Sequence, residues 1–324
     1  MEENTEQRLD LTLFSEKIQE LKERIASVVV GQEQTVDLVL TAILANGHVL
    51  IEGVPGVAKT LLARLTARLI DADFSRIQFT PDLMPSDVLG TTVFNMKTNG
   101  FDFHQGPIFA DIVLVDEINR APAKTQAALF EVMEERQVSI DGTTHRMGEL
   151  YTILATQNPV EQEGTYKLPE AQLDRFLMKL TMDYPSLDEE VNILERHHTN
   201  AAFVKLEDIT PAITKEELLS LRNLMKQVFI DRTLLQYIAL IVQQTRTSKA
   251  VYLGASPRAS VAMLQTSKAY ALLQGRDFVT PEDIKFVAPY VLQHRLILTA
   301  EAEMEGYSPV KVTQRLIDKV EVPK

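Results

Sequence analysis

The segment from residue 48 to residue 70 reads HVLIEGVPGVAKTLLARLTARLI. Its first six residues are mostly apolar and end in a glycine, which is typical of a short buried strand. Its last part carries Leu62, Leu65 and Leu69 at helical spacing, which predicts a helix that buries one side. A strand followed closely by a helix favours a parallel sheet, because parallel neighbours need a crossover connection between them.

Further apolar runs support the same fold class. They predict strands at 76–79, 112–115 and 151–155, with helical patterns between them such as 124–136. Two polar stretches predict β-hairpins that turn at Asn99-Gly100 and Asp141-Gly142, since both dipeptides favour tight hairpin turns. The sequence therefore predicts an α/β core, a parallel sheet flanked by helices, with two β-hairpin insertions.

The chain changes character near residue 185. Helix-start signals recur from there on, with Ser186 and Glu189 at capping-box spacing and a proline after Thr280, and almost no strand signal remains. Before the core, apolar residues at helical spacing predict a helix that Gly31 ends. We therefore expect an N-terminal helical segment (1–30), an α/β core (31–190) and a smaller all-α C-terminal domain (191–324).

Composition excludes several classes of protein. The chain has 324 residues, with 33 basic and 45 acidic side chains and a net charge of −12, which argues against a broad nucleic-acid footprint. It has no cysteine, so disulfides, thiolate metal sites and a cysteine nucleophile are excluded. The first residues lack the apolar core of a signal peptide, and no apolar run is long enough to span a bilayer. We expect a cytoplasmic protein without an integral membrane segment.

Residues 53–60, GVPGVAKT, nearly match the phosphate-binding loop G-x-x-x-x-G-K-[ST]. In such a loop, backbone N–H groups and the dipole of the following helix face the phosphates. Lys59 would then reach the β- and γ-phosphates, and the Thr60 hydroxyl would bind Mg²⁺. Ala58 stands where the pattern has its second glycine.

We expect Ala58 to have helical-type backbone angles with a negative φ, because it immediately precedes Lys59 at the entrance to the helix. The unusual backbone angles would then fall to Gly53 and Gly56, with Pro55 stiffening the loop between them. An alanine with positive φ would cost about 1–2 kcal/mol. In the expected conformation, Ala58 still offers its N–H group to a phosphate.

A second element lies at DIVLVDE, residues 111–117. A buried strand that ends in two carboxylates is the Walker B arrangement, in which Asp116 would hold the Mg²⁺ and Glu117 would orient and deprotonate the attacking water. Taken alone, the pattern is also that of a core strand that ends in solvated acids. Downstream of a phosphate-binding loop, the Walker B interpretation is the stronger one.

Three more polar positions follow strands or begin helices. Asn158 comes at the end of the apolar run ILATQNP, where it would reach the γ-phosphate or the water, although the same letters are also typical of a turn. Arg175 ends LPEAQLDRF, and Arg258 follows Ser256 and Pro257 at a predicted helix start. Each arginine by itself is better explained as a surface charge than as a catalytic group.

Taken in order, these elements resemble the MoxR family of AAA+ ATPases. The resemblance is dense between residues 28 and 182 and continues more thinly through SPRAS into the helical domain, the family's lid. MoxR proteins are similar to magnesium-chelatase ATPase subunits and belong with them to the helix-2-insert clade. By this resemblance, the hairpin at Asn99-Gly100 is that insert, and the hairpin at Asp141-Gly142 precedes sensor 1.

The resemblance implies ATP or ADP with Mg²⁺ as the bound groups. It makes Asp116 and Glu117 the Walker B pair, Asn158 sensor 1, Arg175 the arginine finger and Arg258 the sensor 2 arginine. It also implies a nucleotide-binding set that comprises Val29, Val30, Gly31, Gly53, Val54, Pro55, Gly56, Val57, Ala58, Lys59, Thr60 and Leu61.

An arginine finger acts on the nucleotide of a neighbouring subunit, so the resemblance implies a homo-oligomer, in this family a hexameric ring. The implied function is an ATP-hydrolysing, chaperone-like remodeller in the assembly or maturation of protein complexes or metalloenzymes. Its partner would be a client protein or a von Willebrand factor A domain protein, and a chelatase-subunit role is a variant. Two alternatives stay open: a nucleotide-gated scaffold with slow turnover, and a nucleic-acid motor, against which the net charge of −12 argues.

Overall fold

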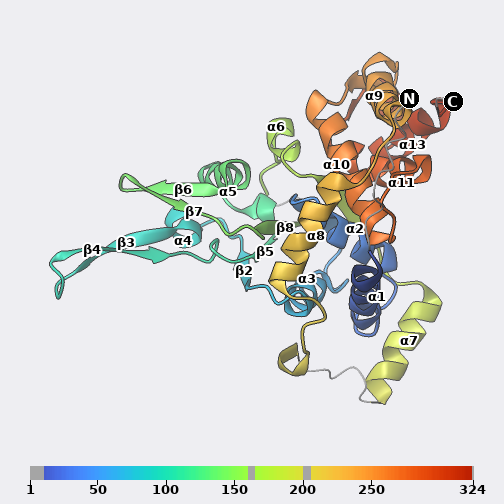
Figure 1. Ribbon diagram of the computed structural model, residues 1–324. Coiled ribbons are helices and arrows are strands. Elements are labelled where there is room, and N and C mark those ends of the chain that lie inside the picture. Colours follow the sequence, from blue (N-terminus) through green and yellow to red (C-terminus); the bar gives the residue numbers. More distant parts are fainter. Residues whose placement is uncertain (1–10, 160–164, 200–205, 323–324) are drawn as a thin grey trace, which may run out of the picture.

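The computed structural model describes residues 11–159, 165–199 and 206–322. Its centre is a five-stranded sheet in the order β2-β5-β8-β1-β9, in which all neighbours run parallel (Figure 1). The strands are β1 (Val49–Gly53), β2 (Phe74–Gln78), β5 (Ile112–Asp116), β8 (Thr152–Gln157) and β9 (Met178–Met182). This arrangement confirms the predicted α/β fold class, and β9 is a strand that the sequence pattern did not predict.

Strand β5 shows why these residues form a sheet that is covered on both faces. All of its residues are buried, and alternate residues belong to different clusters of the core. Leu114 packs in the cluster that contains helices α2 (Glu33–Leu44) and α3 (Lys59–Leu69), whereas Val115 packs in the cluster that contains α5 (Ala123–Glu135). A nearly continuous apolar run is what a parallel strand needs between two helical layers.

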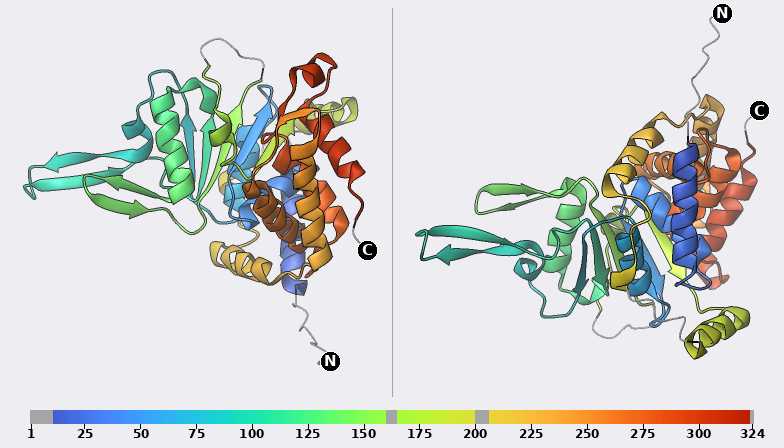
Figure 2. Two further views of the ribbon diagram at one scale, coloured as in Figure 1. Left: turned by 90° about the horizontal axis from the view of Figure 1, so that it is seen from above. Right: turned by 60° about the horizontal axis from the view of Figure 1, so that its bottom comes forward.

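The two hairpins are formed as predicted. They are β3 (Gly90–Asn95) with β4 (Gly100–Gln105), and β6 (Gln137–Ile140) with β7 (Thr143–Arg146), each a separate antiparallel pair. Both extend from the same side of the core, away from the C-terminal helices (Figures 1 and 2). Asn99, Asp141 and Gly142 have positive φ, as tight hairpin turns require.

The C-terminal part is mainly helical and packs directly on the core. Helix α10 contacts α2, and α11 contacts β9, so one apolar cluster runs through both parts. A short antiparallel pair, β10 (Val251–Leu253) with β11 (Ile297–Leu298), was not predicted. The remaining elements are α1 (Thr12–Ala26), α4 (Pro85–Leu89), η1 (Ile118–Arg120), α6 (Glu170–Leu173), α7 (Leu187–His198), η2 (Leu206–Asp208), α8 (Lys215–Gln227), α9 (Arg232–Thr247), α10 (Pro257–Leu273), α11 (Pro281–Leu292), α12 (Ala300–Met304) and α13 (Pro309–Lys319). None of the helices in the described ranges is long and apolar enough to cross a membrane.

The backbone prediction for Ala58 was wrong. Ala58 has φ 62° and ψ 22°, in the left-handed region, and Gly56 also has a positive φ of 88°. Ala58 is the N-cap of α3, and an N-cap lies outside the helix and is not bound to helical angles, which begin at Lys59. Loops that bind an anion through a concave row of backbone N–H groups contain residues in the left-handed conformation. The loop therefore adopts this conformation at Ala58 even though the residue is not a glycine.

Replacing Ala58 by glycine should therefore stabilise the protein. The left-handed conformation costs an alanine about 1–2 kcal/mol, and glycine removes this cost. Glycine also raises the conformational entropy of the unfolded chain, which offsets part of the gain in stability. We expect a net increase in the free energy of unfolding of about 0.5–1 kcal/mol, with nucleotide affinity unchanged within a few-fold. Urea unfolding and nucleotide titration measure both quantities. Ala58→Val should act in the opposite direction, and a less stable Ala58→Gly protein would contradict this account.

His48, just before β1, is buried in the neutral form. Its Nε2 donates to the carbonyl of Met133 at 3.1 Å, and its Nδ1 accepts the backbone N–H of Ile153 at 3.0 Å. Burial, and after it the positive charge of Arg136, lowers the pKa of His48 to about 3. His48 therefore ties three segments of the core together only while it is uncharged.

This lowered pKa predicts a loss of stability in mild acid. Below pH 6.5 the unfolded chain protonates His48, whereas the folded chain does not until about pH 3, so unfolding is favoured as the pH falls between these values. The loss from His48 alone should be about 2 kcal/mol at pH 5, and buried His294, whose pKa is also lowered, adds to it. Urea unfolding at pH 7 and pH 5 should show a weaker pH dependence in His48→Gln, whereas a variant of the exposed His198, His198→Gln, should behave like the parent. Equal pH dependence in all three proteins would refute this role of His48.

Candidate functional site

The residues predicted to handle phosphate and Mg²⁺ lie at one edge of the sheet. Strands β1, β5 and β8 run parallel and end at Gly53, Asp116 and Gln157. Lys59 begins α3 after the loop that follows β1, and Asn158 directly follows β8 and is buried. Ligands of open parallel sheets bind outside the carboxyl ends of the strands, and this edge is that place.

The surroundings of Lys59 connect the phosphate-binding loop with the carboxylates at the end of β5. Its ammonium group donates to the carbonyl of Gly53, which closes the loop onto the end of β1. Burial lowers the pKa of Lys59, and the negative charges of Asp116 and then Glu117 act against this shift. An ammonium group that senses both carboxylates lies between the phosphate-binding loop and the end of β5, as its predicted role requires.

Asp116 is buried, and each of its carboxylate oxygens has a partner. Oδ1 accepts the hydroxyl of Thr156 at 3.0 Å, and Oδ2 is paired with Nε of Arg76 at 2.6 Å. Arg76 is half exposed, so its guanidinium group lies at the solvent side of the carboxylate. Thr60 at the start of α3 and Asp116 carry hard oxygen donors of the kind that Mg²⁺ prefers, and their binding of Mg²⁺ stays a prediction.

Glu117 has an unusual backbone, with φ 56° and ψ 50°. Its N–H group donates to the hydroxyl of Thr156 at 3.0 Å, so Thr156 connects Glu117 to Asp116. The Glu117 carboxylate accepts Nε2 of Gln78 at 2.7 Å and pairs with Nε of Arg120 at 3.2 Å. Left-handed conformations of residues other than glycine cost free energy and concentrate at functional sites, which fits a carboxylate held in one position.

Sequence reasoning missed Arg76, Gln78, Thr156 and Arg120 as contacts of the carboxylate pair. Thr156 had a detectable signal, since it is a polar residue inside the apolar run of β8. Arg76 and Gln78 sit on β2, beside β5 in the sheet, and this neighbour relation follows from the strand order rather than from any local motif.

The segment predicted to lie near the adenine packs against α7. Val29 is buried in the main core cluster, and Gly31 has φ 72°. The Glu189 carboxylate of α7 comes so close that a Cβ on Gly31 would lie within 2.4–2.7 Å of its atoms. The positive φ and this close approach explain the glycine, while adenine contact by Val29, Val30 and Gly31 stays a prediction.

The two predicted arginines share one carboxylate partner, which lies away from the phosphate-binding loop of their own chain. Arg175 pairs with Glu134 on α5 at 2.6 Å and donates to the carbonyl of Phe130. Arg258, near the start of α10, pairs with the same Glu134 at 2.9 Å. The carboxylate of Glu134, which sequence reasoning did not single out, holds both guanidinium groups.

Strand register places this pair at the opposite edge of the sheet. Met178 begins β9 and lies beside Val49, the first residue of β1, and Arg175 precedes Met178 by three positions. The phosphate-binding loop follows Gly53 at the far end of β1, and each strand residue advances the chain by about 3.3 Å. One chain therefore carries the two halves of the predicted catalytic set at opposite edges.

Comparison with known proteins identifies the family. Residues 48–178 match the family model described as "ATPase family associated with various cellular activities (AAA)", and residues 243–318 match an AAA lid domain. The chain is 48% identical to the uncharacterized protein YeaC of Bacillus subtilis over 93% of both chains. It is 43% identical to Chaperone MoxR1 of Mycobacterium tuberculosis over 93% of this chain and 81% of that one.

A crystal structure of a protein from Cytophaga hutchinsonii superposes with a TM-score of 0.89 at 41% identity and covers 97% of each chain. The lid match falls on the helices that were predicted as the C-terminal domain. With the carboxylate pair and the lysine gathered at one edge of the parallel sheet, these similarities lead to one conclusion: the chain belongs to the MoxR family of AAA+ ATPases and is an ATP-hydrolysing enzyme.

Proposed function

We propose that this protein is a chaperone-like remodeller that couples ATP hydrolysis in a homohexameric ring to conformational work on a client protein. The client would be a protein complex or metalloenzyme under assembly or maturation, engaged directly or through a von Willebrand factor A domain partner in the cytoplasm. The similarity to a protein named Chaperone MoxR1 supports this role. The single observation on which the proposed ring rests is that the predicted catalytic residues lie at two opposite edges of the sheet.

Within one chain, the carboxyl edge would bind and orient ATP. Lys59 would bind the β- and γ-phosphates, and Asn158 would contact the γ-phosphate or the attacking water. Thr60 and Asp116 would hold Mg²⁺, which neutralises charge on the phosphates when bound. Glu117 would accept the proton of the water, and Thr156 keeps its backbone fixed relative to Asp116.

The arginines complete the site of a neighbour. Negative charge on the γ-phosphoryl oxygens is stabilised in the transition state by guanidinium groups, and an arginine finger is worth about 10³–10⁵ in rate. Because Arg175 lies beyond the reach of its own phosphate-binding loop, the amino edge of one subunit must face the carboxyl edge of the next. Repetition of such a head-to-tail contact gives a ring when the rotation between neighbours closes, and the proposed hexamer is the closed case. A carboxylate and a phosphate compete for the same guanidinium groups. Arg175 and Arg258 would therefore exchange their ion pairs with Glu134 for contacts with the phosphates of the neighbouring subunit's nucleotide.

A nucleotide-gated scaffold is the second candidate, and the contacts of Glu117 favour it. Gln78 and Arg120 both bind the carboxylate that would serve as base, which restrains it from contacting water. If hydrolysis is unimportant, the ATPase rate will not depend on Glu117 or Arg175. A nucleic-acid motor is disfavoured by the net charge of −12 and would require salt-dependent stimulation of the ATPase by DNA.

A mixing experiment tests whether sites are shared between subunits. Lys59→Ala and Arg175→Ala should each lower the ATPase rate by about 10³-fold or more, because each removes transition-state stabilisation from every site. A one-to-one mixture should recover about a quarter of the parent rate, since that fraction of interfaces pairs an intact lysine with an intact arginine. Steady-state phosphate release measures both effects. Mixing either variant with the double variant is the control and should recover nothing, and no recovery in rings that contain both single variants would refute shared sites.

A second experiment separates the remodeller from the scaffold. Glu117→Gln should retain ATP binding and lose turnover by about 10²–10⁴-fold, because the amide keeps its size but cannot accept a proton. In the remodeller, this ATP-bound variant holds its client, whereas Lys59→Ala does not bind ATP and releases it. Single-turnover kinetics and ATP-dependent client retention measure the two properties. An unchanged rate in Glu117→Gln would reject the hydrolysis-driven remodeller and leave the scaffold.

A further inference from the structure

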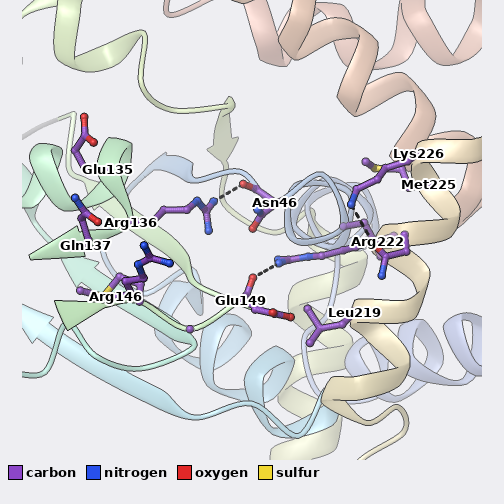
Figure 3. A pocket seen from close by; sticks show the side chains of 14 residues that line it. Asn46, Glu135, Arg136, Gln137, Arg146, Glu149, Leu219, Arg222, Met225 and Lys226 are labelled. Carbon is purple, nitrogen blue, oxygen red and sulfur yellow. Dashed lines mark hydrogen bonds between the residues drawn. The ribbon is translucent and has the colours of Figure 1, made fainter. Parts of the chain in front are cut away.

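A cavity of about 510 Å³ lies at the amino edge of the sheet, at the base of the β6–β7 hairpin and beside α8 (Figure 3). Asn46, before β1, and Glu149, before β8, line one side of it, while Arg222 on α8 lines the other. The phosphate-binding loop follows the opposite end of β1, so this cavity is separate from the predicted nucleotide site. Its volume falls within the range of pockets for small molecules.

Arg222 lines this cavity, and one of its buried donors has no partner among the described residues. The residue is only 7% exposed, its Nε donates to the carbonyl of Ile43 at 2.9 Å, and its Nη1 donates to the carbonyl of Glu149 at 2.6 Å. Its Nη2 is buried and has no hydrogen-bond partner among the residues that the structure describes. Buried donors without a partner are rare in native structures, and each calls for a physical explanation.

Arg136 brings a second guanidinium group to the same cavity. Its Nη1 donates to the carbonyl of Tyr151 at 3.0 Å and its Nη2 to that of Asn46 at 2.6 Å. In Figure 3 the side chains of Arg136 and Arg222 extend toward each other from opposite sides. Burial, and after it the positive charge of Arg136, lowers the pKa of Arg222 to about 10. The two cations oppose each other, and only neutral carbonyl oxygens accept their hydrogen bonds.

The whole lining has an excess of positive charge. Arg146 and Lys226 add two exposed cations at the rim, and Glu135 and Glu149 are the acidic members. Across the described parts of the chain, no carboxylate forms an ion pair with any of the four cations. Buried charges are normally paired, and an unpaired one costs stability. Among the described residues, the four cations of the lining therefore face only two carboxylates, which leaves an excess of positive charge.

We propose that this cavity binds the phosphate group of a small anionic ligand. The negative charge of the phosphate lies between the guanidinium groups of Arg222 and Arg136. Phosphate fits better than a carboxylate because its charge of nearly −2 at neutral pH matches the excess in the lining and because its several oxygens suit more than one guanidinium group. The source is either free inorganic phosphate or a phosphorylated small molecule, for which the cavity has room.

Calorimetric titration tests the site. We use Lys59→Ala protein, so that the predicted nucleotide site does not contribute, and titrate inorganic phosphate or glycerol 3-phosphate at constant ionic strength. The expected result is saturable binding at one site per chain. Arg222→Gln should weaken binding by about tenfold or more and Arg146→Gln by several-fold, because each removes a cation from the lining. Arg232→Gln, at an exposed arginine of α9 outside the cavity, is the matched control and should bind like the parent.

The two ligands separate the two sources. Tighter binding of glycerol 3-phosphate than of inorganic phosphate identifies a phosphorylated small molecule, and equal or weaker binding identifies the free anion. Phosphate binding that is unchanged in Arg222→Gln, or no saturable binding at all, overturns the proposal.

If Arg222→Gln does not fold, the exposed pair Arg146→Gln/Lys226→Gln serves instead, and unchanged binding in that variant overturns the proposal equally. Loss of ring assembly in Arg222→Gln without any phosphate binding by the parent would identify the cavity as a contact between subunits, which also rejects the phosphate site.

Discussion

The register of β1 between β8 and β9 is the constraint on which both halves of the catalytic set depend. Gly53 lies beside Met182 at one end, and a Cβ on Gly53 would come within 2.6 Å of the Met182 carbonyl oxygen. The glycine thus permits the two strands to stay paired up to the point where the phosphate-binding loop begins. At the other end, Val49 lies beside Met178, which fixes Arg175 at the amino edge. A shift of register between these strands would change the distance between the lysine and the arginine, so the observed pairing sets their separation.

Carboxylates pair with charged groups at both edges of the sheet, where the two halves of the predicted catalytic set lie. Asp116 pairs with Arg76 at the carboxyl edge, and Glu134 pairs with Arg175 and Arg258 at the amino edge. The two pairs of Glu134 are partly exposed, and exposed ion pairs contribute little to stability, on the order of 0–1 kcal/mol, whereas in the Asp116 pair only Arg76 is exposed. Such pairs keep the side chains ordered yet are readily exchanged for Mg²⁺ or phosphate, which interact more strongly with them. Weak internal pairing therefore suits a site that is completed only when subunits and nucleotide come together.

The predictable part of this structure is the part that is encoded locally. The strand ends at Gly53 and Asp116 and the two hairpin turns follow from short patterns of apolar residues, glycine and asparagine or aspartate. The φ of Ala58 was missed because a general rule for helix entrances was applied to a residue that lies just outside the helix. Thr156 and Glu134 were missed for another reason: their partners are distant in sequence, and only the strand order and the packing of α5 bring them together.

The other buried arginines of the chain show what is unusual about Arg222. Arg295 is also almost fully buried, and it pairs with Asp174 at 2.7 Å in addition to its carbonyl partners. Arg276 likewise pairs with the buried carboxylate of Asp283. Arg222 and Arg136 differ from these two arginines because their hydrogen bonds go only to carbonyl oxygens. Among the described residues, Glu149 and Asp111 act on Arg222 only at longer range and no carboxylate accepts a hydrogen bond from it, which fits a further counter-charge from outside the chain.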